Sequence, residues 1–244
     1  MKIIILIICG LLPAVLYGQP LIENAENFKV GTVLVFQHCE TENVQFGNGG
    51  ANQVWDFSSL KIKKSETTIE RMVLPQSTKH GELFPKANLV EEYSDNRLVY
   101  MLKTDTENYL LGFVDTTKSL ILKYNDPMLF AKRPLKYGDT ITDSYTTEYS
   151  MKNFDFKGQG TVTIVADGYG KLVLPDNTYE NVLRVKITQE QTDILTQYSS
   201  VSKTETISYI WFDKTHTSAL LKIDETKSTH YNNKSVEYLL SETH

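Results

Sequence analysis

Cysteine is nearly absent from this chain of 244 residues, which contains 2, at positions 9 and 39. Cys9 lies in the apolar run at the N-terminus, so Cys39 alone remains if that run is removed as a signal peptide. A single cysteine cannot form an intramolecular disulfide, and the protein must then be stabilised by its hydrophobic core. The role of this free thiol stays open.

Beyond residue 18 no apolar run approaches the roughly 20 residues that a membrane-spanning helix needs, which argues against a transmembrane segment. The N-terminal run itself begins with Lys2, continues as an unbroken apolar stretch and ends in small residues near Gly18, the layout of a signal peptide. We therefore expect residues 1–18 to be a signal peptide and residues 19–244 to form a single β-rich domain. The mature protein is expected to be exported, either to the periplasm or beyond the cell.

Clusters of positive charge are also absent. The formal net charge is −5, and lysines and arginines are scattered along the chain. This distribution argues against nucleic acid and anionic membrane surfaces as partners. We expect a monomer whose partner is a small apolar or glycan ligand, or another envelope protein.

Catalytic signatures are missing as well. The five histidines include no pair spaced for zinc, and His38 and Cys39, as neighbours on a strand, point to opposite faces. There is no G-x-S-x-G motif, and the glycine-rich residues 47–50 lack the Lys-Ser/Thr of a phosphate loop. The sequence thus predicts no catalytic residue, metal or cofactor. Two carboxylates across a cleft would suffice for a glycosidase, so that mechanism stays open, although Glu91-Glu92 is most simply a solvated edge.

Short runs with a period of two dominate what is present, and they are rich in Val, Ile, Thr and Tyr. Clusters of turn-forming residues separate them, so consecutive strands should pair antiparallel. We predict an all-β protein, either an antiparallel sandwich or a strongly curled half-barrel sheet, with little helix. The expected strands before residue 158 cover residues 32–36, 61–72, 98–103, 109–114, 119–124 and 140–151.

Residues 158–187 carry the clearest strand pattern. Val162 and Ile164 alternate with threonines, Asp167-Gly168 and Gly170 tolerate turn conformations, and residues 172–174 resume the alternation. This pattern predicts a hairpin that turns at residues 167–170. Pro175-Asp176-Asn177 predicts a second turn into a strand at residues 183–187.

Aromatic residues are abundant, with 14 Tyr, 10 Phe and 2 Trp, and would suit sugar stacking or an apolar pocket. Trp55 and Trp211 lie in dense apolar context, which favours core packing for both. Tyr169, between two glycines, is the ring expected to be exposed. Tyr169 and Trp211 are the candidate binding residues.

Several phrases resemble a group of uncharacterised secreted β-rich domains of Bacteroidota exported proteins. They are GGANQVWDFSSL (49–60), FPKANLV (84–90), PLKYGDT (134–140), ADGYGKLVLPDNTYENVLRVK (166–186) and SYIWFDKTHTSALLKID (208–224). The resemblance implies export and a β-rich domain, and it brings no established reaction. Members often carry a C-terminal sorting domain for type IX secretion, which this sequence lacks, so periplasmic residence is equally expected.

Three functions follow from these observations. The first is a non-enzymatic exported domain that binds a ligand or envelope partner, for which two-sided apolar strands between residues 98 and 124 suggest a sheet curled around an apolar ligand. The second is a glycan-binding module or a carboxylate-pair glycan hydrolase. The third is a structural or adaptor protein of an envelope assembly, attached through exposed strand edges.

Overall fold

The computed structural model describes residues 18–244, so the predicted signal peptide lies almost wholly outside the described residues. Within this range there is no α-helix, and the helical content is two single 3₁₀ turns, Pro75–Ser77 and Gly81–Leu83. The prediction of an all-β protein with little helix is confirmed.

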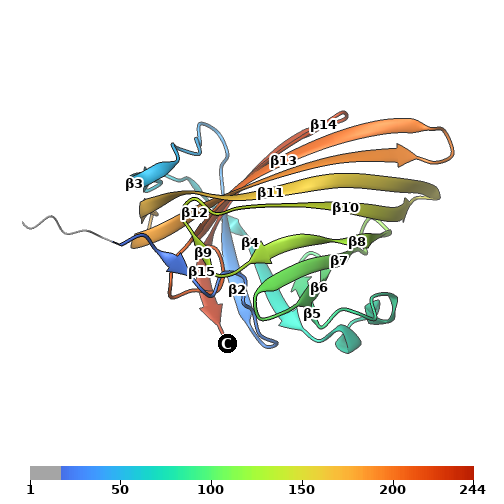
Figure 1. Cartoon of the computed structure of the whole chain (residues 1–244), viewed down its shortest axis with the longest axis horizontal. Coiled ribbons are helices and arrows are strands. Elements are labelled where there is room, and N and C mark those ends of the chain that lie inside the picture. Colours follow the sequence, from blue (N-terminus) through green and yellow to red (C-terminus); the bar gives the residue numbers. More distant parts are fainter. Residues whose placement is uncertain (1–17) are drawn as a thin grey trace, which may run out of the picture.

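Twelve antiparallel strands form a closed barrel (Figure 1). In order around the ring they are β2 (Val33–Cys39), β4 (Ile62–Val73), β5 (Leu89–Tyr93), β6 (Arg97–Lys103), β7 (Glu107–Asp115), β8 (Leu120–Lys132), β10 (Thr140–Met151), β11 (Phe154–Val173), β12 (Thr178–Leu195), β13 (Ser200–Phe212), β14 (Leu221–Ser228) and β15 (Asn232–Thr243). From β4 onward each strand of the ring pairs with the next one along the chain, and β15 returns to pair with β2.

Closure distinguishes this fold from the sandwich or half-barrel that we predicted. The ring is completed where β10 pairs with β11 along its full length, from Thr140↔Val165 to Met151↔Phe154, and where β2 lies between β4 and β15. Closing a sheet on itself satisfies the backbone groups that an open edge would leave unpaired. The strands are unequal in length, and the hairpins built from β10 to β13 extend well past the rest of the barrel (Figure 1).

The predicted hairpin at residues 167–170 is wrong, because β11 runs through these residues as one strand with two register shifts. The glycines in this range do not form a turn; they allow another strand to approach β11 closely. A Cβ on Gly170 would lie 2.0 Å from the carbonyl oxygen of Gln53, on β3 (Gly50–Asp56), which pairs with β11 in parallel. The second predicted turn is confirmed, since the Leu174 amide donates to the Asn177 carbonyl oxygen at 2.8 Å and β12 follows.

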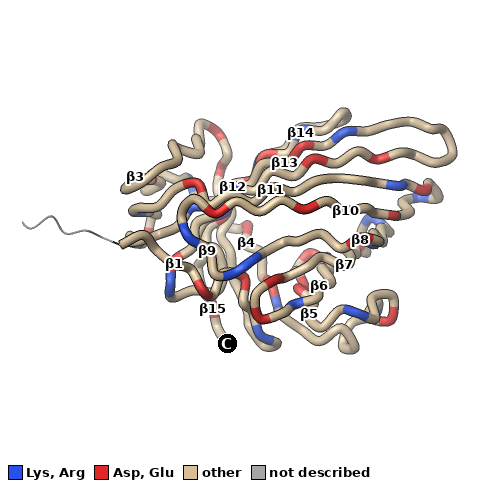
Figure 2. The backbone as a smooth tube through the Cα atoms, viewed as in Figure 1, with Lys and Arg blue, Asp and Glu red and all other residues tan. Residues whose placement is uncertain are grey.

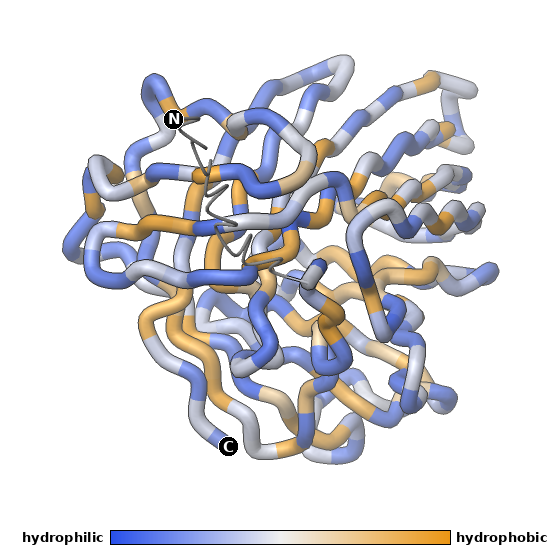
Figure 3. The backbone as a smooth tube through the Cα atoms, turned by 60° about the vertical axis from the view of Figure 1, so that its left-hand side comes forward, coloured by the Kyte–Doolittle hydropathy of each residue, from blue (hydrophilic) through white to orange (hydrophobic). Residues whose placement is uncertain are grey.

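The segment of residues 40–61, which contains β3, packs against the outer face of the barrel wall. Its Trp55 and Phe57 pack edge-on against Trp211 of β13 with centroid separations of 5.9 and 5.4 Å, and Leu221 and Ile223 of β14 belong to the same core. The outward residues of this wall are therefore apolar and buried. Apolar and polar residues alternate along the strands (Figure 3), so the inward positions of the same strands can be polar.

The N-terminal segment adds a two-stranded sheet, in which β1 (Leu21–Ile22) pairs with β9 (Leu135–Lys136). The chain that follows is fixed by buried polar side chains of the barrel. The Asn108 amide donates to the Glu26 carbonyl oxygen at 2.7 Å, and the Arg133 guanidinium donates to the Ala25 carbonyl oxygen at 3.3 Å. These bonds hold Ala25 and Glu26 against the barrel interior.

Candidate functional site

A cavity of about 260 Å³ lies inside the barrel. Strands from both sides of the ring line it, and so does the N-terminal segment, which contributes Ala25 and Glu26. One part of its wall is aliphatic and aromatic: Val99, Leu110, Phe130, Leu135, Ile164, Val185, Ile187, Ile210 and Phe212. The other part is polar and consists of Glu26, Glu91, Tyr93, Lys132, Ser208, Lys222 and Asp224. The cavity is thus amphipathic.

Strand register brings the polar groups together. Across the wall Lys222 of β14 lies opposite Glu237 of β15, and Glu237 lies opposite His38 of β2. Because side chains on a strand alternate between faces, Asp224 joins Lys222 on the inner face while Leu221 and Ile223 point outward. The charged residues of β14 therefore face the inside of the barrel.

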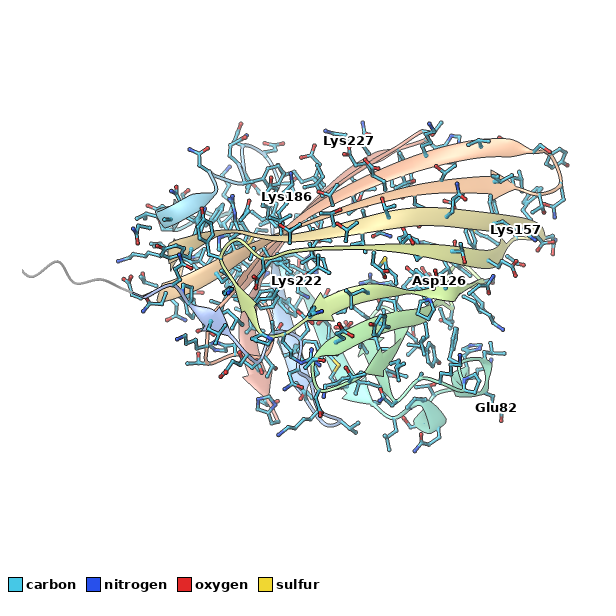
Figure 4. The ribbon with its side chains drawn as sticks, viewed as in Figure 1. Glu82, Asp126, Lys157, Lys186, Lys222 and Lys227 are labelled. Carbon is cyan, nitrogen blue, oxygen red and sulfur yellow. The ribbon has the colours of Figure 1, made fainter. Side chains whose placement is uncertain are left out.

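Lys222, labelled in Figure 4, is the centre of this cluster. Its Nζ lies 3.4 Å from Oε1 of Glu70 and 3.6 Å from Oε1 of Glu237, and 3.9 Å from the ring centroid of Phe36. Its side chain keeps 19% of its surface accessible, and since Lys222 lines the cavity, we attribute that surface to the cavity. These carboxylates raise the pKa of the Lys222 ammonium above its ordinary value despite the desolvation that opposes this. Lys222 is thus a fixed positive charge.

The carboxyl groups around Lys222 are protonated more readily than free ones. Burial raises the pKa of Glu70 well above its ordinary value and raises that of Glu91 and Asp224, while the charge of Lys222 opposes each shift. One carboxyl oxygen of Glu70, Oε2, has no hydrogen-bond partner. Each of these carboxyl groups therefore takes up a proton at a higher pH than a free carboxyl group does.

Glu26 differs from the other acids because it lies on the N-terminal segment and not on a strand. Its backbone is in the left-handed region at φ 54°, where the bond from its amide to the Thr217 carbonyl oxygen, 2.8 Å long, helps to hold it. Burial raises the pKa of its carboxyl to about 7, with Lys222 acting in the opposite direction. Among the described residues no side chain forms a hydrogen bond or ion pair with this carboxyl, although it lines the cavity.

A larger recess of about 900 Å³ lies over β10 to β14, but it is open to solvent. Exposed polar side chains such as Ser144, Gln159 and Glu190 make up most of its wall. Tyr145 in this wall is buried and burial raises its pKa, but no buried acid or base and no apolar wall accompany it among the residues that line the recess. The interior cavity is therefore the better candidate despite its smaller volume.

The residues that the sequence suggested for binding lie elsewhere. Trp211 is fully buried on the outer face of β13, and Trp55 is buried beside it, which confirms core packing for both. Tyr169 is half-buried with its ring 5.3 Å from that of Tyr137, whereas Tyr198 is the far more exposed ring at 71%. Neither Tyr169 nor Trp211 lines the interior cavity, and a binding role for either stays a prediction.

The prediction that Glu91 belongs to a solvated edge is wrong. Its side chain is buried in the barrel, and only Glu92 keeps partial exposure. His38 is half-buried, with Nε2 2.7 Å from Oγ1 of Thr68, and the thiol of Cys39 is buried. The cluster was missed because acids and lysines in a strand are ordinarily solvent-facing, and nothing local marks the inner face as the polar one.

Comparison of the chain with protein-family models, with curated proteins and with solved structures finds no significant match. Two further findings concern residues 18–244. No helix in this range is long and apolar enough to cross a membrane. No three His, Cys, Asp or Glu side chains there are arranged to hold a metal ion, so the acids around Lys222 do not form a metal centre.

Proposed function

We propose that the protein is an exported, non-enzymatic binding protein that holds one small amphipathic ligand inside its barrel. The observation that carries the proposal is the interior cavity, whose wall is apolar on one part and charged on the other. Such a wall binds a ligand by burying its apolar body while a few polar groups orient its head. The head would lie at Lys222 and its carboxyl groups.

Cavity size limits the ligand. A cavity of about 150 Å³ in another protein accommodates benzene. The volume here, about 260 Å³, therefore suits a body of one or two rings or a short alkyl chain. A phospholipid or an extended glycan chain would not fit within it.

The two other predicted functions stay open, and no observation favours them over binding. A glycan hydrolase needs two carboxyl groups across a cleft with water between them, whereas Glu70 and Glu237 both approach the same lysine. An adaptor that uses exposed edges would need unpaired strand edges; the ring strands pair on both sides, whereas β3 pairs with β11 on one side only. The relation to the Bacteroidota group and the export of the chain are likewise proposals, which cell fractionation with and without residues 1–18 would test.

Binding is testable with three probes that share one apolar body: cyclohexylmethylamine, cyclohexylmethanol and cyclohexanecarboxylate. We expect at least one of them to bind with 1:1 stoichiometry in isothermal titration calorimetry. Ile210→Trp, which fills the cavity, should abolish that binding, and Leu110→Trp should do so from the opposite wall. Ile194→Trp is the matched control, since Ile194 is 44% exposed and distant from the cavity lining.

Absence of binding by all three probes to the folded wild-type protein would contradict the proposal. Binding that survives both tryptophan substitutions would contradict it equally, because the ligand would then lie outside the barrel. Circular dichroism and thermal unfolding establish that each variant is folded before its binding is compared.

A further inference from the structure

We propose that the head group of the ligand is a cation, so that the cavity takes a small organic amine with an apolar body. This inference rests on the proposed function, because it concerns the ligand of the same cavity. It is carried by the imbalance of charge at the polar part of the wall and by one buried carboxyl group that has no partner.

Acids outnumber bases around the polar end of the cavity. Five carboxyl groups act electrostatically with Lys222: those of Glu26, Glu70, Glu91, Asp224 and Glu237. Lys222 is the lysine they share, and its ammonium is already within 3.6 Å of two of them. Lys132 also lines the cavity, but its Nζ lies 3.0 Å from Oε1 of Glu107, an acid outside the lining. Arg133 also acts on Glu26, but its guanidinium is occupied by the oxygens of Thr104, Asp105 and Asn108. When these acids are ionised, negative charge at this wall is therefore in excess.

Glu26 is the group that a ligand would meet. Glu26 keeps only 8% of its surface exposed, it lines the cavity, and no described side chain pairs with its carboxyl group. A buried carboxyl without a partner is costly in its ionised form, and a cation inside the cavity removes that cost. An ammonium group has three donors, enough to reach Glu26 and a second carboxyl such as Glu91.

An anionic head is disfavoured by the same charges. A carboxylate ligand could pair with Lys222, but carboxyl oxygens of Glu70 and Glu237 already lie 3.4 and 3.6 Å from its Nζ, and the incoming charge would face the other acids when they are ionised. At 4 Å two like charges repel by about 4 kcal/mol at an effective dielectric constant of 20. A metal cation is disfavoured by geometry, because the described acids do not converge on a common point.

The main alternative to a cationic head group is a neutral one, such as an alcohol. With protons on its carboxyl groups the wall could donate to and accept from an alcohol, and an alcohol would need no change of protonation. An ammonium, in contrast, favours the ionised form of Glu26, whose pKa is raised to about 7 by burial in the empty protein. Amine binding should thus expel a proton below pH 7, whereas alcohol binding should not.

The test compares the three cyclohexyl probes on the wild-type protein by calorimetry at pH 5, 7 and 8, in buffers of different ionisation enthalpy. We expect the amine to bind about tenfold more tightly than the alcohol at pH 8, with the carboxylate weakest. The affinity for the amine should rise with pH and that for the alcohol should stay constant. Glu26→Gln should reduce the amine's advantage by about tenfold, and Glu26→Asp should retain part of it.

Glu148→Gln is the matched control, since the side chain of Glu148 is 52% exposed, and it should leave every affinity unchanged. If the alcohol or the carboxylate binds as tightly as the amine, the inference about the head group is overturned while the cavity remains a binding site. If none of the three probes binds, the proposed function itself fails. An amine preference that Glu26→Gln leaves intact would also overturn the inference.

Discussion

Two buried cations lie on opposite faces of the same stretch of barrel wall, and their surroundings differ. Arg184 of β12 faces outward, where its guanidinium donates to both carboxylate oxygens of Asp167 at 2.8 and 2.9 Å and to the Phe46 and Gly47 carbonyl oxygens. The rings of Trp55, Tyr209 and Trp211 surround it. One acid balances one base there, and side chains fill the space.

Lys222 of β14 faces inward and shows the opposite arrangement, with several acids, looser ion-pair distances and a void beside it. Charges are distributed along the whole chain with no region of one sign (Figure 2), so the excess inside the barrel is local. A balanced and filled ion pair fastens one segment to another. An unbalanced cluster beside a cavity leaves interactions for a ligand to complete.

The largest effect is expected from Arg184→Met. This change leaves Asp167 without its partner and frees the residue 40–61 segment from the barrel wall, so we expect a loss of about 4 kcal/mol in the free energy of unfolding. Urea denaturation measures it. A loss below about 1 kcal/mol would mean that Arg184 does not hold this segment against the barrel wall. The contrast that we draw between Arg184 and Lys222 would then be wrong for Arg184.

Glu26 should give the protein a pH-dependent stability. Its pKa rises from 4.5 to about 7 on folding, so the folded protein binds more protons than the unfolded chain between these values, and stability falls as pH rises through that window. At 1.36 kcal/mol per pKa unit, this shift lowers the free energy of unfolding by about 3 kcal/mol once pH has risen through the window. The charged groups that act on the Glu26 carboxyl are Lys222, Glu70, Arg133 and Glu242, and Glu26 in turn acts on Glu91.

Unfolding curves of wild type and Glu26→Gln between pH 4.5 and 8 isolate this contribution, because the other titrating groups are common to both. We expect the free energy of unfolding of the variant to increase relative to that of the wild type as pH rises. Parallel pH profiles would show that the Glu26 carboxyl titrates normally and is not desolvated.

Lys222→Met should cost less than Arg184→Met, because the carboxyl groups around it can take up protons. Loss of the lysine raises the pKa of Glu70 and Glu91 further, which penalises the folded state increasingly as pH rises. We expect a loss of about 2 kcal/mol at pH 8 and less than half of that at pH 5. A loss that is independent of pH would contradict the coupling between these residues.

The smallest effect is expected from Lys157→Met at the surface (Figure 4). The ion pair of Lys157 with Glu148 is 3.5 Å long, and the lysine side chain is 68% exposed. Surface pairs of this kind contribute at most about 0.5 kcal/mol here. A larger loss in the same denaturation assay would show that burial does not determine how much Arg184, Lys222 and Lys157 each contribute to stability.

Local patterns predicted much of the fold. The strands at residues 98–103 and 109–114 coincide closely with β6 and β7, because alternation and turn residues act over a few positions. Closure of the ring and the pairing of β3 with β11 could not be predicted in this way, since they join residues such as Gly50 and Gly168 that are distant in sequence. The glycines at 168 and 170 therefore suggested a turn where the structure has a close approach.

The candidate site was hidden for a related reason. In the sequence Leu221-Lys222-Ile223-Asp224 the alternation is plain, and its ordinary interpretation places the apolar residues inside. In this barrel the residue 40–61 segment buries the outer face, so the apolar residues point outward and the charged ones inward. Only the position of that distant segment decides which face is polar.

The ionisation of Glu26 can be followed directly by carbon-detected NMR on protein labelled at its glutamate side chains, with Glu26→Gln used to assign the resonance. We predict a midpoint near pH 7 in the free protein and a fall of at least about one unit when cyclohexylmethylamine is bound, since an adjacent ammonium favours the carboxylate. A midpoint near 4.5 in the free protein, or one that the amine leaves unchanged, would contradict a ligand site built on an unpaired buried carboxyl.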